Sequence, residues 1–331
     1  MKLVIRNFNK DDMPAVFDFY KVKDLLPSDS YKFQPYTMND FYRLIIEEGP
    51  FGERFDQSGF FLAFENGKLV GVARAHVGSQ SSDQNEKVGF ITPEWPWSPV
   101  GFAVLPQYRR KGIGSMLLER CFEYLRGKDA KLVQTSTDEM CASRVNFFSK
   151  YGFKPWGKTI VFMERDLRKP IPKPILPEGY LFEQFRSDEK EELIECHNKL
   201  FEGEWLYIPR SVAGFVNFYE RNPDFDPTGF FNITYKGEIV GFIWNIISKS
   251  YVENSGRKLG LLEVLGVAKE HRQKGLGTAL TLRALIWHRE KGMDHVSLNT
   301  HSDVARNLYI KCGFEIVSRW QIMRRPLSFN I

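Results

Sequence analysis

Residues 104–114 read Val-Leu-Pro-Gln-Tyr-Arg-Arg-Lys-Gly-Ile-Gly, and residues 267–277 read Val-Ala-Lys-Glu-His-Arg-Gln-Lys-Gly-Leu-Gly. Both stretches follow an apolar run, open an amphipathic helical segment, and are followed further on by Gly152-Phe153 or Gly313-Phe314. The first glycines of the two stretches, Gly112 and Gly275, lie 163 positions apart, and the later Gly-Phe pairs lie 161 positions apart. An offset that steady indicates a duplicated domain.

The composition of the 331 residues is that of an ordinary folded protein with about two domains. Apolar residues make up 43% and aromatic residues 15%, which is enough for two hydrophobic cores. The net charge of +5 is mild, and no lysine and arginine cluster interleaves with aromatic residues, so we expect no nucleic-acid partner. No apolar stretch is long enough to span a bilayer, so we expect no membrane association.

The four cysteines, Cys121, Cys141, Cys196 and Cys312, are scattered and show no C-x-x-C spacing. This pattern argues against a zinc site and against a disulfide framework, so we expect no metal. It also fits a reducing compartment, and the apolar run at the N-terminus is too short for a signal peptide. We therefore predict a cytoplasmic protein.

A proline-rich stretch at residues 168–177 divides the chain, because closely spaced prolines exclude helix and central strand. We predict a first domain at residues 1–168, a linker at 169–177 and a second domain at 178–331. Both halves show the same order of apolar periodicities, which predicts an α/β fold with a twisted mixed sheet flanked by helices in each. The chain would then be a monomer with an internal pseudo-dimer, or a weak homodimer.

The expected elements come in matching sets. The first half has expected strands at 3–8, 59–64, 69–77 and 132–136 and helices at 10–22, 38–48, 112–126 and 142–150; the second half has strands at 180–185, 230–235, 239–247 and 295–299 and helices at 188–201, 211–221, 275–291 and 303–311. A fourth strand should run into each repeated stretch, and two further strands should close each half. The halves differ at residues 79–98, a long polar loop with Trp95 and Trp97, which we interpret as a surface excursion or a lid.

A strand followed by Arg-x-x-Gly-x-Gly and a helix is suited to binding an anion. The first turn of a helix presents backbone N–H groups without partners, and its dipole end is positive. Glycines at alternate positions remove side chains that would keep a diphosphate away from these donors. We expect Arg109 and Arg272 to shape the loops. The alternative is a tight strand–helix turn without a ligand.

On these two loops the chain resembles the GCN5-related N-acetyltransferase superfamily, whose signature is Q/R-x-x-G-x-G/A, and the resemblance covers both halves as tandem domains. It implies acetyl-coenzyme A as the cofactor, with the pantetheine arm along a fourth strand that is splayed from the fifth. In the family, a free backbone N–H on that strand polarises the thioester carbonyl. The implied cofactor-binding residues are Phe102, Ala103, Val104, Arg109, Arg110, Lys111, Gly112, Ile113, Gly114 and Ser115 in the first half, and Leu265, Gly266, Val267, Arg272, Gln273, Lys274, Gly275, Leu276, Gly277 and Thr278 in the second.

The second half also resembles the catalytic half of tandem members of the mycothiol synthase type. Residues 305–314 fit the pattern A-x-x-x-Y-x-x-x-G-F, in which Tyr309 is the implied proton donor to the departing thiolate. A phenol of pKa ~10 stays protonated until a thiolate with a conjugate pKa of ~8.5 develops beside it. In the first half, Phe148 takes this position and has no proton to donate, so we expect catalysis in the second domain.

An attacking amine must lose a proton, often to a carboxylate. Glu263 shares a face of the fourth strand with Val267, so we name it as the candidate base, with an ion-paired surface glutamate as the alternative. His271 and His301 are further candidates, although a solvated histidine is the simpler interpretation of each. The acceptor would be a small-molecule or peptide amine, and aromatic and acidic side chains before the hairpin would either line its pocket or belong to the core: Phe201, Trp205, Tyr207, Phe215, Phe218, Tyr219, Glu202 and Glu204.

Two other functions stay open at this point. One is a non-catalytic acyl-coenzyme A sensor, and the other is transfer of a longer acyl group or an aminoacyl group. Residues 152–159 also match the nucleotide-binding pattern G-x-x-x-x-G-K-[ST], but that pattern requires a preceding strand and a following helix. Here a helix is expected before it and a strand after it, so we interpret the match as a coincidence.

Overall fold

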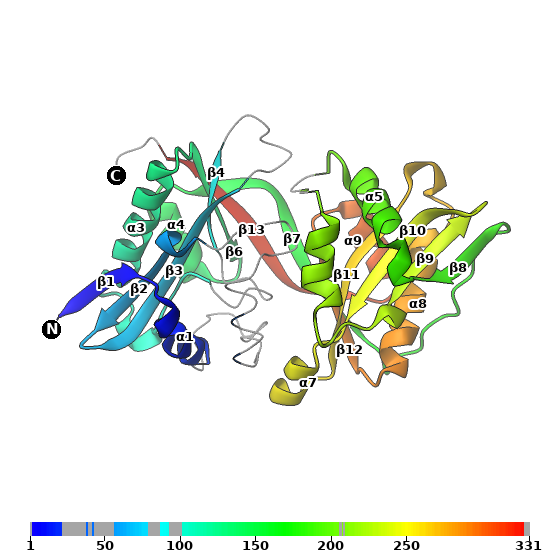
Figure 1. Cartoon of the computed structure of the whole chain (residues 1–331), viewed down its shortest axis with the longest axis horizontal. Helices are drawn as coiled ribbons and strands as arrows, with labels where there is room; N and C mark the ends of the chain where they lie inside the picture. Colours follow the sequence, from blue (N-terminus) through cyan, green and yellow to red (C-terminus); the bar gives the residue numbers. More distant parts are fainter. Residues whose placement is uncertain are drawn as a thin grey trace. The chain divides into compact units, whose positions relative to one another are not determined.

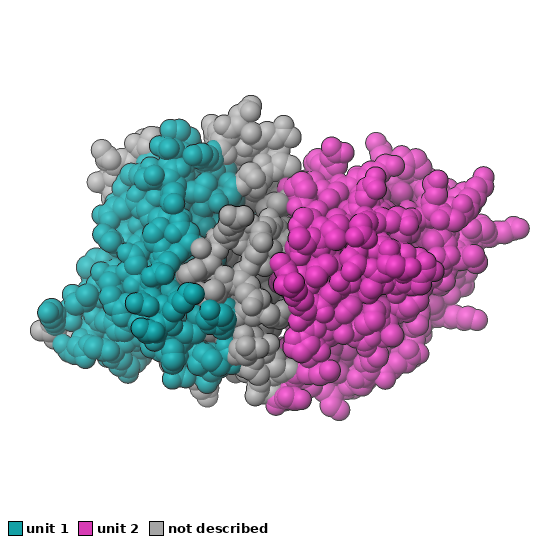
Figure 2. Space-filling view, in the orientation of Figure 1, with its two compact units in different colours: residues 1–48, 53–159, 318–331 teal, residues 49–52, 160–317 magenta. Residues whose placement is uncertain are grey.

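A computed structural model describes residues 2–21, 38, 42, 56–78, 87–92, 101–204, 207 and 209–327. The chain forms two compact units (Figures 1 and 2), which we call unit 1 (residues 1–48, 53–159 and 318–331) and unit 2 (residues 49–52 and 160–317). The division at 1–168, 169–177 and 178–331 stays a prediction about the sequence repeats. The compact units do not coincide with the repeats. Unit 1 includes the end of the second repeat, and unit 2 includes the end of the first.

Unit 1 contains a mixed sheet with strand order β1-β2-β3-β4-β6-β13. Its elements are β1 (Leu3–Asn7), α1 (Met13–Tyr20), β2 (Phe60–Glu65), β3 (Lys68–Gly78), β4 (Val88–Ile91), β5 (Ala103–Val104), α3 (Ile113–Gly127), β6 (Leu132–Asp138), α4 (Ala142–Lys150), the start of β7 (Lys154–Asp166) and most of β13 (Glu315–Pro326). The expected helix at 38–48 lies outside the described residues except for Met38 and Tyr42, both of which are helical. The short β5 pairs with β3 alone.

Unit 2 repeats this plan with strand order β7-β12-β11-β10-β9-β8. Its further elements are β8 (Tyr180–Gln184), α5 (Lys190–Phe201), α6 (Val212–Phe215) with a π-helical continuation (Val216–Glu220), β9 (Phe230–Tyr235), β10 (Glu238–Ile246), α7 (Lys249–Ser255), β11 (Leu259–Val267), α8 (Leu276–Glu290), β12 (His295–Thr300) and α9 (Asp303–Lys311). The expected α/β class, with a mixed sheet and helices, is confirmed in both units. Helix α7 was not expected from the sequence.

Both hairpins form for the same local reason. The loop of β2 and β3 is Asn66-Gly67, and that of β9 and β10 is Lys236-Gly237, and all four residues have positive φ. A two-residue turn with positive φ at both positions matches the twist of antiparallel strands. The expected hairpins are therefore present in both halves.

Buried side chains fill both faces of the unit 2 sheet. One core cluster joins Ile243 and Leu262 to the inner residues of α8 and α9, and a second joins Trp244 and Val264 to those of α5 and α6. Side chains of successive strand residues point to opposite faces, so helices cover both faces of this sheet. None of the helices in the described part of the chain is long and apolar enough to cross a membrane.

The last strand of each repeat completes the sheet of the other repeat. Residues Val161–Asp166 of β7 pair with β12 in unit 2, and residues Trp320–Pro326 of β13 pair with β6 in unit 1. We had expected two closing strands in each half; the structure has one long strand in each instead. Both strands carry a buried arginine near their ends. Arg165 donates to the Cys312 carbonyl at the end of α9 (3.0 Å), and Arg325 donates to the Tyr151 carbonyl at the end of α4 (2.6 Å).

The fourth strand differs between the units. In unit 2 it is continuous as β11, whereas in unit 1 it is divided into β4 and β5. Strand β4 lies inside residues 79–98, so the expectation of one long loop there was wrong in part; Trp95 and Trp97 lie outside the described residues. The sheet registers align Gly89 with Gly260, each paired to the fifth strand, and the loops align Val104 with Val267. The extra residues of unit 1 therefore lie between Thr92 and Gly101.

Candidate active site

The two glycine loops have the same backbone conformation. Arg110 and Gln273 have φ of 63° and 62°, and Gly112 and Gly275 have φ of 81° and 84°. Gly112 and Gly275 are the N-cap residues of α3 and α8, and a Cβ added to either would meet no atom within 4 Å. Alternation of left-handed and right-handed residues turns successive amides to one side, which makes an anion-binding concavity. Both loops therefore present amides to open space at a helix start.

The arginine that opens each loop is bound to the preceding strand. Arg109 donates to the carbonyl of Val104 at 3.0 Å, and Arg272 donates to that of Val267 at 3.0 Å. Their guanidinium groups thus hold the loop against the strand end. In unit 2, Lys274 donates to the hydroxyl of Tyr180 (3.1 Å), which also bonds His271 Nδ1 at 2.9 Å. His271 therefore belongs to a network beside the loop.

The side chains of the other predicted loop residues range from buried to exposed. Ile113 and Leu276 point into the cores, so only their backbone can serve a ligand. Ser115 and Thr278 are half-buried, whereas Lys111 and Lys274 are exposed at the loop surface. The cradle in each unit is thus made of backbone amides with one lysine at its rim.

A gap opens between the fourth and fifth strands of unit 2. Strand β11 pairs with β12 only from Leu259 to Leu261, whereas its pairing with β10 continues to Val267. Glu263 is the extra residue of a β-bulge, since Trp244 and Asn245 oppose Val264 and Leu262. Such bulges re-aim a strand and its side chains. The predicted cofactor residues 265–267 line the part of β11 that has left β12.

Tyr309 lies on α9, which follows β12, the strand on the other side of this gap. The hydroxyl of Ser302 caps the helix by accepting from the Ala305 amide (3.3 Å), and Arg165 donates to the Cys312 carbonyl at its C-terminal end. Tyr309 is 5% exposed and packs against Phe314, with 5.6 Å between ring centroids. Burial raises the pKa of its hydroxyl. The phenol therefore holds its proton at neutral pH.

Glu263 is held at the bulge by two groups from the segment before β9. Its Oε1 accepts from the hydroxyl of Tyr219 at 3.3 Å and lies 3.8 Å from Nη2 of Arg210. Arg210 is buried, donates to Tyr219 and lies 4.9 Å from the Trp244 ring centroid. Burial alone would lower the pKa of Arg210, but Tyr219 and Glu263 together raise it. The Glu263 side chain stays 26% exposed, so it is both oriented and accessible.

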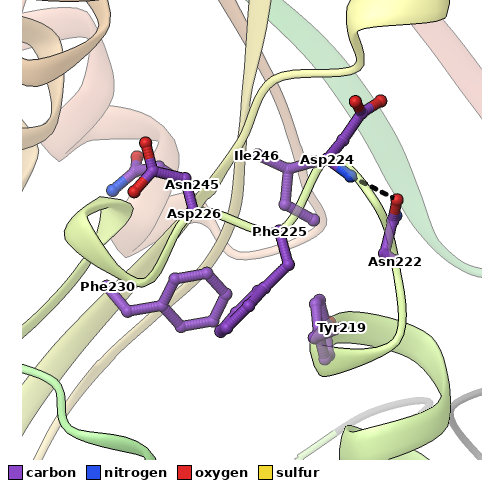
Figure 3. A pocket seen from close by; sticks show the side chains of 8 residues that line it. All are labelled: Tyr219, Asn222, Asp224, Phe225, Asp226, Phe230, Asn245 and Ile246. Carbon is purple, nitrogen blue, oxygen red and sulfur yellow. Dashed lines mark hydrogen bonds between the residues drawn. The ribbon is translucent and has the colours of Figure 1, made fainter.

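The aromatic set expected around the acceptor lies largely in the core. Phe215 and Tyr219 are buried, and Phe201 and Phe218 pack against the same cluster; Trp205 lies outside the described residues. Glu202 and Glu204 are exposed, whereas the carboxylate of Glu263 accepts a hydrogen bond from Tyr219 of this set. A small recess adjoins Tyr219, and its lining includes Asp224 and the packed rings of Phe225 and Phe230 (Figure 3).

Three arginines near these sites gave no signal in the sequence. Arg210, Arg165 and Arg144 follow no motif, and each matters through a contact with a residue distant in the sequence: Glu263, Cys312 and Phe102, respectively. Of the three, Arg144 alone could have been noticed by aligning the two repeats, because the second repeat has Ala305 at its position.

In unit 1, Phe148 occupies the position of Tyr309. It lies on α4, is 1% exposed, and packs against Phe153 as Tyr309 packs against Phe314, with ring centroids 5.4 Å apart. The two positions are thus equivalent in packing and differ by one hydroxyl. Thr92 takes the place of Glu263, so unit 1 has neither the phenol nor the carboxylate at these positions.

A mixed sheet that opens between its fourth and fifth strands, with an anion cradle at the helix start beside the opening, defines a tandem acyl-coenzyme A-dependent transferase. The model of the acetyltransferase (GNAT) family matches residues 19–153 and 178–314. The chain belongs to the GNAT acetyltransferase family. It is an N-acetyltransferase, and an acyl-coenzyme A is its donor.

Relatives support the same assignment. The chain is 30% identical over 249 residues to a mycothiol acetyltransferase of Thermobispora bispora, covering 72% of this chain and 79% of the relative. It is 31% identical over 219 residues to that of Saccharomonospora viridis, covering 65% and 70%. A tandem GNAT protein from the clavulanic acid biosynthesis pathway has the same fold, with a TM-score of 0.73, 17% identity and full coverage of both chains.

Proposed function

We propose that this protein transfers an acetyl group from acetyl-coenzyme A to a primary amine by direct attack on the thioester, and that the transfer takes place in unit 2. The observation that carries the proposal is the matched pair of Tyr309 and Phe148, which occupy equivalent packed positions while only Tyr309 has a hydroxyl. Glu263 lies on the strand of the same gap. Acid and base candidates therefore occur together in unit 2.

Each residue has one role in this scheme. The amides around Gln273–Gly277 would hold the diphosphate, and the gap beside Leu265 would take the pantetheine arm. When bound, acetyl-coenzyme A supplies the thioester. Glu263 accepts the proton of the attacking amine, directly or through water, while Arg210 and Tyr219 orient its carboxylate. Tyr309 gives its proton to the departing sulfur.

The names of the relatives point to a small molecule as the first acceptor class to test. They are named mycothiol acetyltransferases, and the recess beside Tyr219 is small and is lined by two carboxylates, those of Asp224 and Asp226. A small amine, attracted by Asp224 in the recess and by Glu263, which accepts from Tyr219 of the recess lining, fits this size and charge better than a folded protein surface. A cytoplasmic location, and a monomer or weak homodimer, stay predictions from the sequence.

The test is a thiol assay of coenzyme A release with an amine panel, comparing wild type with Tyr309→Phe. General-acid catalysis contributes about 10²–10⁴-fold, so we expect kcat to fall by that order while acetyl-coenzyme A affinity is nearly unchanged. Phe148→Tyr is the matched control in unit 1, and it should leave kcat within about twofold of wild type. Equal kcat values for Tyr309→Phe and wild type would contradict the role of Tyr309.

A further inference from the structure

The hydrogen-bonding pattern of β11 shows which of its backbone groups face the gap in unit 2. The amide of Ala268 donates to the carbonyl of Val240 at 2.8 Å. Hydrogen-bonded pairs of antiparallel strands recur at every second residue, so Gly266 also faces β10 and Leu265 faces the gap. Within the described part of the chain, no residue hydrogen-bonds the backbone groups of Leu265, so these groups are not already taken by a protein partner.

The same pattern in unit 1 identifies Phe102 as the counterpart of Leu265. The Leu105 amide donates to the carbonyl of Val70 at 2.9 Å, so Ala103 faces β3 and Phe102 faces away from it. Both backbone groups of Phe102 have partners. Its amide donates to the carbonyl of Thr92 at 3.1 Å, and its carbonyl accepts from Nη1 of Arg144 at 3.1 Å.

The side chains around Phe102 are also larger than those around Leu265. Arg144 lies one helical turn before Phe148, where unit 2 has Ala305 before Tyr309. The Phe102 ring is 6% exposed, with its centroid 5.6 Å from that of Phe147 and 5.8 Å from that of Phe148. Unit 2 has leucines, Leu265 and Leu308, at the positions of Phe102 and Phe147. A guanidinium and three rings thus cover this part of the strand in unit 1.

In unit 1, β4 pairs with β6 only from Val88 to Phe90, and β5 does not continue this pairing, so a corresponding gap lies beside Phe102. We propose that this gap is closed to acyl-coenzyme A by Arg144 and by the rings of Phe102, Phe147 and Phe148, so that the chain binds a single acyl-coenzyme A, in unit 2. The loops do not distinguish the units, because their φ angles agree within a few degrees. The units differ at the fourth strand. In unit 1, the backbone N–H and C=O of Phe102, which would bind an amide of the pantetheine arm, already have hydrogen-bond partners. This inference rests on the proposed function, which places the donor in the gap of unit 2.

Calorimetric titration of the full chain with acetyl-coenzyme A tests the stoichiometry. We expect one site per chain, and two sites would overturn the inference. A titration without heat at any protein concentration would instead count against the proposed function. Gly275→Asp places a carboxylate at the open side of the unit 2 loop, and aspartate tolerates the left-handed conformation better than most residues. It should remove the site, and a remaining full site in the folded variant would show that unit 1 binds.

Arg144→Ala copies the residue of unit 2 and tests the role of the guanidinium. We expect this variant to bind two acetyl-coenzyme A molecules per chain. Lys150→Ala is the control, because it removes the same charge from the exposed end of the same helix, and it should keep one site. If Arg144→Ala keeps one site while its melting temperature shows a folded protein, Arg144 does not close the gap and the proposal is overturned.

Discussion

His288 should make unit 2 sensitive to acid. Its side chain is 0% exposed on α8 and packs on the backbone of Gly260, where an added Cβ would lie 2.2 Å from its Nδ1. Burial lowers the pKa of His288 to about 3. Because the folded-state pKa lies below the ordinary value of 6.5, the stabilising effect is complete above pH 6.5 and is lost as the pH falls from 6.5 toward 3. Each pH unit that the pH falls in this window lowers the free energy of unfolding by ~1.4 kcal/mol. His288 should therefore lower it by about 2 kcal/mol between pH 7 and pH 5.

The variant His288→Leu isolates this contribution, because unit 1 has Leu125 at the equivalent place against Gly89. Urea unfolding at pH 7 and pH 5, followed by fluorescence and circular dichroism, should show that the variant loses about 2 kcal/mol less than wild type. His76 and His197 are also largely buried, but both proteins contain them, so their contributions to the loss at low pH cancel in the comparison. The reciprocal variant, Leu125→His, should add a similar acid loss. Identical losses for wild type and His288→Leu would refute the argument.

Two other predictions follow from the exchanged strands. Arg165→Met removes a guanidinium that binds the carbonyls of Cys312 (3.0 Å) and Pro170 (2.8 Å). It should lower the free energy of unfolding by about 2–5 kcal/mol in urea titrations. The control variant Arg168→Met, at an exposed arginine, should lower it by less than ~1 kcal/mol. Similar losses for both variants would contradict the anchoring role of Arg165. The fragment 178–331 lacks the segment Val161–Asp166 that pairs with β12, so it should be aggregated or unfolded by size exclusion and circular dichroism, and a folded monomeric fragment would count against the exchange.

The glycine loops could be predicted from the sequence because their conformation is local. Gly112 and Gly275 have positive φ at a helix start, where glycine is favoured, and the residues that decide this lie within one turn. The hairpin turns at Asn66-Gly67 and Lys236-Gly237 are local in the same sense. Tyr309 was named through the resemblance to the family pattern A-x-x-x-Y-x-x-x-G-F, which covers only one helix and its end, and its role stays a prediction.

The details of the candidate site could not be predicted because they depend on contacts between distant residues. Glu263 was named from the alternation of its strand, but the bulge that presents it depends on the register with β10. Arg210 lies in a segment without regular periodicity, and only folding brings it to Glu263. A buried arginine that pairs with a distant residue produces no motif or periodicity in a single sequence.

The sequence by itself determined the duplication, the two anion loops, the α/β class and the difference between Tyr309 and Phe148, because repeats, turn residues and periodicity are properties of short segments. Tertiary structure alone decided that the ends of β7 and β13 each join the sheet of the other repeat, that Glu263 lies on a bulge, and that Arg144 binds the Phe102 carbonyl. The physical reason is that every strand edge presents the same N–H and C=O groups. Which edge a strand joins is therefore set by the packing of the whole chain.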